Sequence, residues 1–463
     1  MKQQDITSPM SSGERRATVS LAGIYALRML GLFMILPVLS IYAEQLDGAT
    51  PMLMGLAISI YGLTQALLQI PFGLMSDRFG RKRIIIIGLL LFSAGSMVAA
   101  LASNIYWVLA GRALQGAGAI ASAVMALLAD LTDEVHRTKA MATVGLSIAL
   151  SFGVAITLGP MLAGTIGVPG IFALTALLAL LAIIVLKWWV PNPSAIKVHR
   201  DAELIPEDAA SVFKNAELLR LNYGIFTLHL ILTASFVVLP LMLRDAGLAA
   251  QNHGFMYLPV FVLSLAGAVP MIIIAEKKRR MKPVFVTAIG LIVLAEAGLF
   301  WFGDGLPGLI AFIAVFFIGF NLLEATLPSL ISKTAPADRK GTAMGFYSSA
   351  QFFGAFLGGV LAGGVIELWG GGWVFVCAGI LALTWLLVAL TMKPPRYLAN
   401  LLISVPTLTE PQETAFVRRL LAVTGVAEVK IYPEEQTAYL KVDNSQLDRD
   451  ALSALLAEPL PEV

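Results

Sequence analysis

The chain has 463 residues, of which 58% are hydrophobic and 13% are charged. A soluble domain is usually nearer half apolar and a quarter charged, so this composition favours a protein that lies in lipid. The formal net charge of +2 gives no reason to expect nucleic-acid binding. A single cysteine, Cys377, excludes an internal disulfide and a cysteine-based metal cluster.

Apolar runs recur along the chain and predict roughly twelve membrane helices, each long enough to cross about 30 Å of hydrocarbon. The polar N-terminal tail, 1–17, has no short apolar core followed by a small-residue cleavage site. The first run is therefore expected to be a retained helix rather than a signal peptide. The expected ranges in chain order are 18–43, 52–76, 84–103, 105–130, 139–166, 169–190, 218–243, 253–275, 283–302, 307–331, 340–368 and 372–392.

These spans divide the chain into an N-terminal bundle over 18–190 and a C-terminal bundle over 218–392. A central loop over 191–217 joins them, and a short helix can form near 208–216. Lys and Arg gather in the loops after spans two, four, eight and ten, whereas the loop at 44–51 carries only acidic charges. Because basic loops stay in the cytoplasm, the central loop and both termini are expected there.

An internal repeat relates the two halves. Pro71 is followed by Asp77-Arg78 and Arg81, and at an offset of about two hundred residues Pro270 is followed by Glu276-Lys277 and Arg280. Two repeated bundles of this kind are typical of alternating-access transporters. The alternative is that any membrane protein with an even number of spans shows basic loops on one side. The spacing of the proline, the acid and the base favours a true repeat.

The loop between spans two and three, 73–83, resembles the signature loop of the major facilitator superfamily. It carries all the fixed positions of that motif: Gly73, Asp77, Arg78, Gly80, Arg81 and Lys82. In span four, the segment 112–118 resembles the Arg-Gln-Gly motif of proton-coupled members. The span-five antiporter element is weaker, because alanine stands at 155 and 163 where glycines are usual. The resemblance implies an all-α membrane fold of twelve helices in two pseudo-twofold-related sets, and proton-driven transport. The degenerate element leaves the direction of coupling open.

The resemblance also implies a role for the signature loop. Asp77 is expected near the start of span eleven, where helix amides and the helix dipole favour a carboxylate. Arg78 and Arg81 are expected to pair with Asp77 and with Asp130 at the end of span four. We expect this set to act as a latch that favours the outward-open state. The alternative is that these charges only orient the chain in the membrane.

Polar side chains at bilayer depth are costly and usually functional. Glu324 in span ten and His229 in span seven are the candidate proton carriers. A structural hydrogen bond between helices is the alternative for each. Glu296, deep in span nine, has no assigned role and is expected to face a neighbouring helix. The candidates for lining a central cavity are Arg28, Arg112, Gln115 and Asn321.

The residues after the last span are no longer apolar and form a linker, 393–399, and a soluble domain, 400–463. Strands are expected at 401–405, 426–432 and 437–442, and helices at 410–423 and 447–455. This order predicts a small α+β ferredoxin-like domain. It resembles the metal-carrier domains of heavy-metal pumps, but the region after its first strand has no cysteine, so metal binding by that route is not expected. Regulation, a cytoplasmic partner and self-association remain open.

The leading hypothesis is a secondary active transporter of a bacterial inner membrane that exports small organic compounds, driven by the proton gradient and without another cofactor. A proton-coupled metabolite importer and a membrane sensor acting through the C-terminal domain are the alternatives. No catalytic triad or phosphate-binding loop is visible in the sequence, so neither an enzyme nor an ATP-driven pump is expected.

Overall fold

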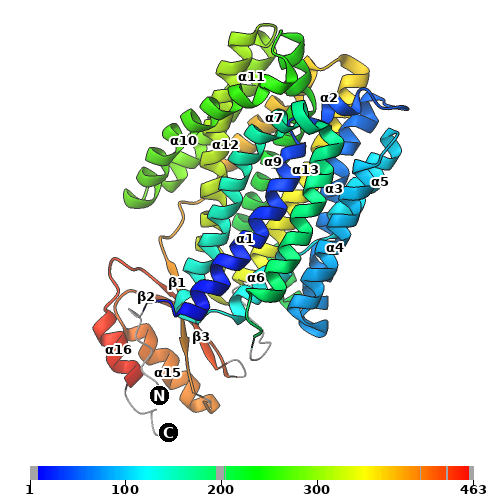
Figure 1. Ribbon diagram of the computed structural model, residues 1–463. Coiled ribbons are helices and arrows are strands. Elements are labelled where there is room, and N and C mark those ends of the chain that lie inside the picture. The colour runs from blue at the N-terminus through cyan, green and yellow to red at the C-terminus, as the bar shows by residue number, and fades with distance from the viewer. Residues whose placement is uncertain (1–8, 194–202, 204, 407, 434–435, 458–463) are drawn as a thin grey trace.

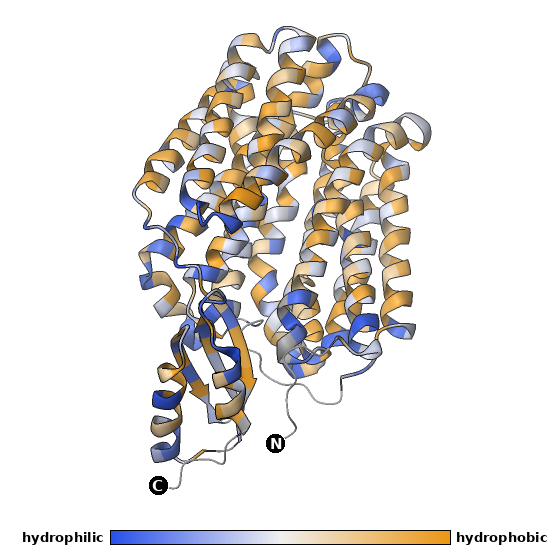
Figure 2. Cartoon of the chain, turned by 90° about the vertical axis from the view of Figure 1, so that its left-hand side faces the viewer, coloured by the Kyte–Doolittle hydropathy of each residue, from blue (hydrophilic) through white to orange (hydrophobic). Residues whose placement is uncertain are grey.

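The computed structural model describes residues 9–193, 203, 205–406, 408–433 and 436–457. Long helices form an elongated bundle, and a small sheet domain lies at one end of it (Figure 1). Eleven of the described helices are long and apolar enough to cross a membrane. Apolar residues dominate the length of the bundle, whereas charged residues gather at its end and in the small domain (Figure 2).

The first half of the bundle accounts for six predicted spans with seven helices. These are α1 (Ser12–Ile35), α2 (Leu39–Ala43), α3 (Pro51–Phe79), α4 (Arg81–Ala100), α5 (Ile105–Ala117), α6 (Ala121–Asp130) and α7 (Glu134–Trp188). The range α7 contains two predicted spans that meet at Gly167, where the backbone leaves the helical conformation and the chain turns. Gly167 has φ 70°, a conformation that glycine adopts without a steric penalty.

Two predicted spans are broken in the structure. Span one divides into α1 and α2 around Pro37, and span four divides into α5 and α6 around Gly118. The second break exposes the carbonyl of Gly118, which accepts a hydrogen bond from Nη2 of Arg28 at 3.1 Å. The buried guanidinium therefore satisfies a backbone group that the helix leaves unpaired.

The second half begins with the turn η1 (Pro206–Asp208) and the short helix α8 (Ala209–Lys214), close to the short helix expected in the central loop. The remaining elements follow in order. They are α9 (Ala216–Asp245), η2 (Ala250–Asn252), α10 (His253–Lys277), α11 (Met281–Phe302), α12 (Leu306–Thr334), η3 (Ala337–Arg339), α13 (Lys340–Trp369) and α14 (Gly372–Leu390).

The C-terminal domain has the predicted order of strands and helices. Its elements are β1 (Ala399–Ser404), α15 (Glu410–Ala422), β2 (Val426–Tyr432), β3 (Thr437–Val442) and α16 (Arg449–Ala457). The strands form an antiparallel sheet in the order β1-β3-β2. Phe416 and Leu420 of α15 and Leu452 of α16 pack with sheet residues such as Leu440, so the domain has an apolar core of its own.

The two ends of the bundle differ in character. We call the end that carries Arg81, Arg280 and the C-terminal domain the basic end, and the opposite one the far end (Figure 1). Helix α3 runs from the far end to the basic end, and α13 runs back beside it from the basic end to the far end. Contacts between the two bundles can therefore be assigned to one end or the other by residue number.

Candidate functional site

The signature loop forms an ion cluster around Arg81, where α3 ends and α4 begins. The guanidinium contacts Asp77 one helical turn before it, Asp130 at the end of α6 at 3.1 Å, and Glu203 of the central loop at 2.6 Å. It also donates to Oγ of Ser76 at 3.0 Å. The side chains of Arg81 and Asp130 are 1% and 0% exposed, so direct contact rather than water compensates these charges.

The other fixed residues of the signature loop shape it rather than join its ion cluster. The guanidinium of Arg78 lies over the ring of Phe79. Nζ of Lys82 donates to the carbonyl of Val190 at 2.5 Å, which ties the loop to the end of α7. Gly80 has φ 98° and makes the turn between α3 and α4. Gly73 faces Ser122 of α6, where a Cβ would come within 3.2 Å of the serine Cβ.

The central loop occupies the position that the sequence assigned to Asp77. The amide of Ile205 donates to Oγ1 of Thr342, in the first turn of α13, at 2.9 Å. Asp208 lies 3.2 Å from Nε of Arg339, and Glu203 holds Arg81 on the other bundle. The expected contact of Asp77 with the start of span eleven is thus replaced by a bridge of central-loop residues. The sequence analysis did not single out Glu203. An acidic residue in the central loop, close to the basic loops of both bundles, could have been predicted to pair with one of their arginines.

Arg28 is buried inside the N-terminal bundle and does not line a cavity in this conformation. It is 0% exposed and its Nη2 donates to the hydroxyl of Tyr61 at 2.8 Å and to Oε1 of Gln65 at 2.8 Å, besides Gly118. Its guanidinium also lies 5.3 Å from the ring centre of Phe92. The cavity-lining prediction was wrong here because the break after α5 and the polar side chains of α3 supply acceptors within the bundle.

Arg112 and Gln115 are also enclosed by the N-terminal bundle. Arg112 donates to the carbonyls of Ala57 and Ile58 on α3 at 3.2 and 3.0 Å, and to Oε1 of Gln115 at 2.9 Å. Gln115 in turn donates to Oγ of Ser96 on α4 at 2.7 Å. Both were predicted to line the cavity, and both instead join α3, α4 and α5 through hydrogen bonds that are strong in a low-dielectric interior.

The two candidate proton carriers come from different helices and lie together. Oε1 of Glu324 on α12 is 3.3 Å from Nε2 of His229 on α9. Nε2 of Gln351 on α13 is 2.8 Å from the same imidazole nitrogen. The Glu324 side chain is 32% exposed and the His229 side chain is 14% exposed, but Oε1 of Glu324, the oxygen that faces the ring, is itself buried.

This arrangement suits one exchangeable proton. An amide nitrogen only donates, so with Gln351 oriented as it stands the imidazole of His229 is neutral and accepts at Nε2. Gln351 then uses the single lone pair of Nε2, so Glu324 lies 3.3 Å from this nitrogen without a hydrogen bond to it. Alternatively, the ring takes up the proton and Gln351 turns its oxygen toward it. Asn321, the remaining cavity candidate, lies on the same helix and donates to Oγ of Ser264 on α10 at 2.7 Å.

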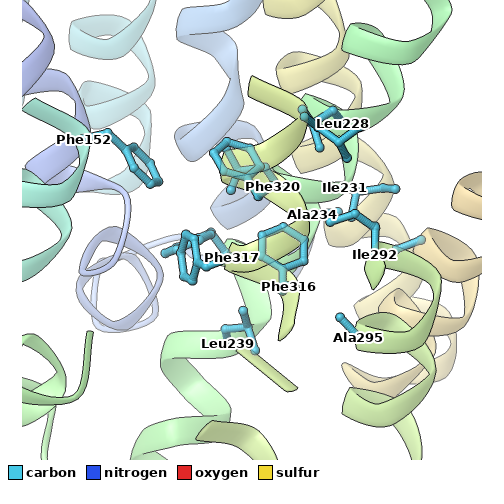
Figure 3. Close-up of a cluster of buried hydrophobic side chains, with 14 of the residues drawn as sticks. Phe152, Leu228, Ile231, Ala234, Leu239, Ile292, Ala295, Phe316, Phe317 and Phe320 are labelled. Carbon is cyan, nitrogen blue, oxygen red and sulfur yellow. The ribbon is translucent and has the colours of Figure 1, made fainter. Parts of the chain in front are cut away.

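An aromatic layer separates this pair from the far end. Phe152 of α7 packs against Phe317 and Phe320 of α12, with ring centres 6.1 and 5.7 Å apart (Figure 3). Helix α12 runs from the far end to the basic end, so these phenylalanines precede Glu324 on the far side. Because Phe152 belongs to one bundle and the other rings to the second, the layer closes the space between the bundles.

The far end is closed by direct contact between the bundles. Nη1 of Arg244, at the end of α9, lies 2.5 Å from Oε2 of Glu44, at the end of α2 and 200 residues earlier. The two residues occupy corresponding places in the repeat. Glycines bring the helices together here. Gly55 of α3 and Gly359 of α13 meet backbone to backbone, and Gly254 of α10 meets the carbonyl of Thr157 on α7. Small residues at such seams allow close helix approach in a membrane.

Gly55→Val is expected to open the far end, because its Cβ would clash with the carbonyl oxygen of Gly359. In a chain with Cys377 replaced by serine, spin labels are attached at positions 45 and 249. Double electron–electron resonance should then show a longer distance between these labels in Gly55→Val than in the chain without this change. Gly290→Val on α11 is the matched control, since a Cβ at Gly290 has nothing within 4 Å. If the distance between the two labels is the same in Gly55→Val and Gly290→Val, the contact of Gly55 with Gly359 does not hold the far end closed.

Glu296 faces a neighbouring helix, as expected from the sequence. It is 0% exposed on α11, and its Oε1 accepts from Oγ of Ser235 on α9 at 3.3 Å. Apolar residues including Ala295, Ile292 and Ala234 surround this region (Figure 3). The side chain lies between α11 and α9, and its hydrogen bond is to Ser235 rather than to Glu324 or His229.

The second signature loop, between α10 and α11, binds the C-terminal domain. Arg279 has φ 52°, at the position that corresponds to Gly80 in the repeat. A left-handed conformation costs a residue with a side chain roughly 1–2 kcal/mol. Nη2 of Arg279 contacts Oδ1 of Asp443 at 2.8 Å and Oγ of Ser445 at 2.7 Å, and the guanidinium lies over the ring of Tyr397. The strained residue is thus the one that holds the domain.

These features define a membrane transporter built from two repeat-related bundles, with a glutamate–histidine contact inside the second bundle and an ion cluster at the basic end. The profile of the Major Facilitator Superfamily matches residues 21–359 and 321–425, and the chain belongs to that family. Residues 401–457 match the YajR YAM domain. The family and fold predicted from the signature loop are therefore confirmed.

Relatives support the same assignment. The chain is 48% identical to the inner membrane transport protein YajR of Escherichia coli K12 over 440 residues, covering 95% of this chain and 97% of that protein. It is 30% identical to the bacillibactin exporter of Bacillus subtilis, covering 73% of this chain and 87% of that protein. The crystal structure of a D-xylose–proton symporter has the same fold, with a TM-score of 0.67 at 16% identity, over 83% of this chain and 99% of that one.

Proposed function

We propose that this chain is a proton-coupled exporter of small organic compounds that works by alternating access, with both termini in the cytoplasm of a bacterial cell. The observation that carries the proposal is the contact of Glu324 on α12 with His229 on α9, inside the C-terminal bundle and beside Phe320, which packs on Phe152 of the other bundle. A carboxyl at bilayer depth is costly unless it is paired or protonated, which makes this pair the natural place to bind and release a proton.

The position of the pair supports an inward-facing conformation. Phe152, Phe317 and Phe320 lie between Glu324 and the far end, and the Glu44–Arg244 contact closes that end. The positive-inside rule assigns the basic end to the cytoplasm. Glu324 would then exchange its proton with the cytoplasm here. It would take one up from the periplasm once the far end opens and the basic end closes.

Two relatives favour export over import. The bacillibactin exporter is 30% identical, and the quinolone resistance protein NorA of Staphylococcus aureus is 26% identical over 356 residues. The first is named as an exporter of bacillibactin and the second as a protein of quinolone resistance. A fluorescent quinolone is therefore a reasonable first probe for this chain.

Inside-out membrane vesicles separate export from import. With an acidic lumen, a proton antiporter should accumulate a fluorescent quinolone inside the vesicles, and the accumulation should collapse when a protonophore removes the gradient. Vesicles from cells without the chain are the control. A metabolite symporter would instead drive its substrate out of an acidic lumen. Failure across a panel of quinolones, catecholates and sugars would favour a sensor that acts through the C-terminal domain.

A further inference from the structure

The C-terminal domain is held on the C-terminal bundle by buried polar contacts as well as by Arg279. Nζ of Lys441 on β3 donates to the carbonyls of Ser332 and Lys333 at 2.9 and 3.1 Å, in the last turn of α12. A cation at this place satisfies carbonyls that the helix end leaves free. Lys441 is 2% exposed, and burial lowers the pKa of its ammonium group to about 8, with Lys340 adding to the effect and Glu428 opposing it.

Aromatic side chains complete the docking surface. The hydroxyl of Tyr432 on β2 donates to Asp338 of η3 at 2.8 Å, and Tyr439 packs with Leu402 and Ala337. The hydroxyl of Tyr397, in the linker, accepts from the amide of Met281 at 2.8 Å. Linker, β2 and β3 therefore all contact the loops of the C-terminal bundle, between α10 and α11 and between α12 and α13.

Strand β1 reaches the other bundle. It lies against α7, which belongs to the N-terminal bundle, and also against α12, which belongs to the C-terminal bundle (Figure 1). The far end is already closed in this conformation, so the basic ends are the ones that must approach each other when the transporter switches. A strand that touches both bundles at the basic end stands in the way of that approach.

We propose that the C-terminal domain is a wedge, docked through Arg279 and Lys441, that holds the basic end open and must shift before the outward-open state forms. This inference rests on the proposed alternating-access function. The left-handed residue Arg279 contributes to this docking, because its side chain forms an ion pair with Asp443. The corresponding residue of the first half, Gly80, has no side chain and forms only the turn. Release of the domain would relax that residue and free β1 from one bundle.

Two pairs of spin labels on the full-length chain, with Cys377 replaced by serine, test the wedge. Labels at Arg83 and Lys277, exposed in the two signature loops, report the separation of the basic ends. Labels at Lys277 and Arg418 report docking of the domain. In the double variant Arg279→Gly with Lys441→Met, the docking pair should lose its short-distance peak and the basic-end pair should shift to shorter distances. Arg449→Gln, an exposed change on α16, is the control and should leave both pairs unchanged.

The outcomes are distinct. Release of the domain without closure of the basic ends would overturn the wedge, and so would a domain that stays docked in the double variant. Gly55→Val provides the separate check on alternating access, because opening the far end should also shorten the basic-end distance. If the distance between the basic-end labels shortens in Gly55→Val but not when the domain is released, the wedge is refuted and alternating access is retained. A pair that responds to neither refutes the proposed function as well.

Discussion

Arg81→Gln is expected to lower the melting temperature of the purified transporter by several degrees and to detach the central loop. The change removes the guanidinium that contacts Asp130 and Glu203, whose side chains are 0% and 7% exposed. Removing one partner of a buried ion pair typically costs about 3–5 kcal/mol, because the remaining charge stays desolvated. Thermal unfolding in detergent, followed by tryptophan fluorescence, measures the loss.

Matched variants identify the source of that loss. Arg78→Gln changes the same residue type in the same loop, but Arg78 lies on the exposed ring of Phe79, so its effect should be small. Adding Glu203→Gln to Arg81→Gln should recover part of the stability, because it removes one of the uncompensated charges. If Arg78→Gln and Arg81→Gln lower the melting temperature equally, the cluster around Arg81 is not the stabilising element.

The long helices and the C-terminal domain could be predicted because their signals are local. Runs of apolar residues mark the spans, and the alternation of strands and an amphipathic helix marks the tail. The turn at Gly167 was predicted by the boundary between the spans at 139–166 and 169–190, whereas the break at Gly118 was not. The break at Gly118 depends on Arg28, which is 90 residues away in the chain, and no local pattern announces that hydrogen bond.

The site was predicted in part for a related reason. A charge in an apolar run is visible from the sequence, so Glu324 and His229 were found, but their contact depends on how α9 and α12 are placed. Arg28 and Arg112 gave the same signal and yet lie inside one bundle, because the carbonyls that bind them are not visible as acceptors in a sequence. Asp77 was expected at the start of span eleven, but it pairs with Arg81 and the amide of Ile205 binds Thr342 there, a contact that no local sequence pattern marks.

Glu324→Gln is expected to abolish accumulation driven by the pH gradient while retaining substrate binding. Glutamine keeps the size and the hydrogen-bonding groups of a protonated carboxyl, so the contact with His229 can persist. It cannot release a proton, so substrate movement would no longer be coupled to the gradient. The measurement compares gradient-driven accumulation of the fluorescent quinolone in inside-out vesicles with exchange of the same probe across vesicles without a gradient.

Glu296→Gln is the informative control, because it removes a second buried carboxyl of the same bundle. Glu296 is enclosed between α11 and α9 and lies away from the aromatic layer between the bundles. Its loss should leave gradient-driven accumulation intact. A chain in which Glu324→Gln keeps full gradient-driven transport and Glu296→Gln loses it would place the proton site at the contact of α11 with α9 instead. Coupling would then act through Ser235 and α9 rather than through the contact of α9 with α12.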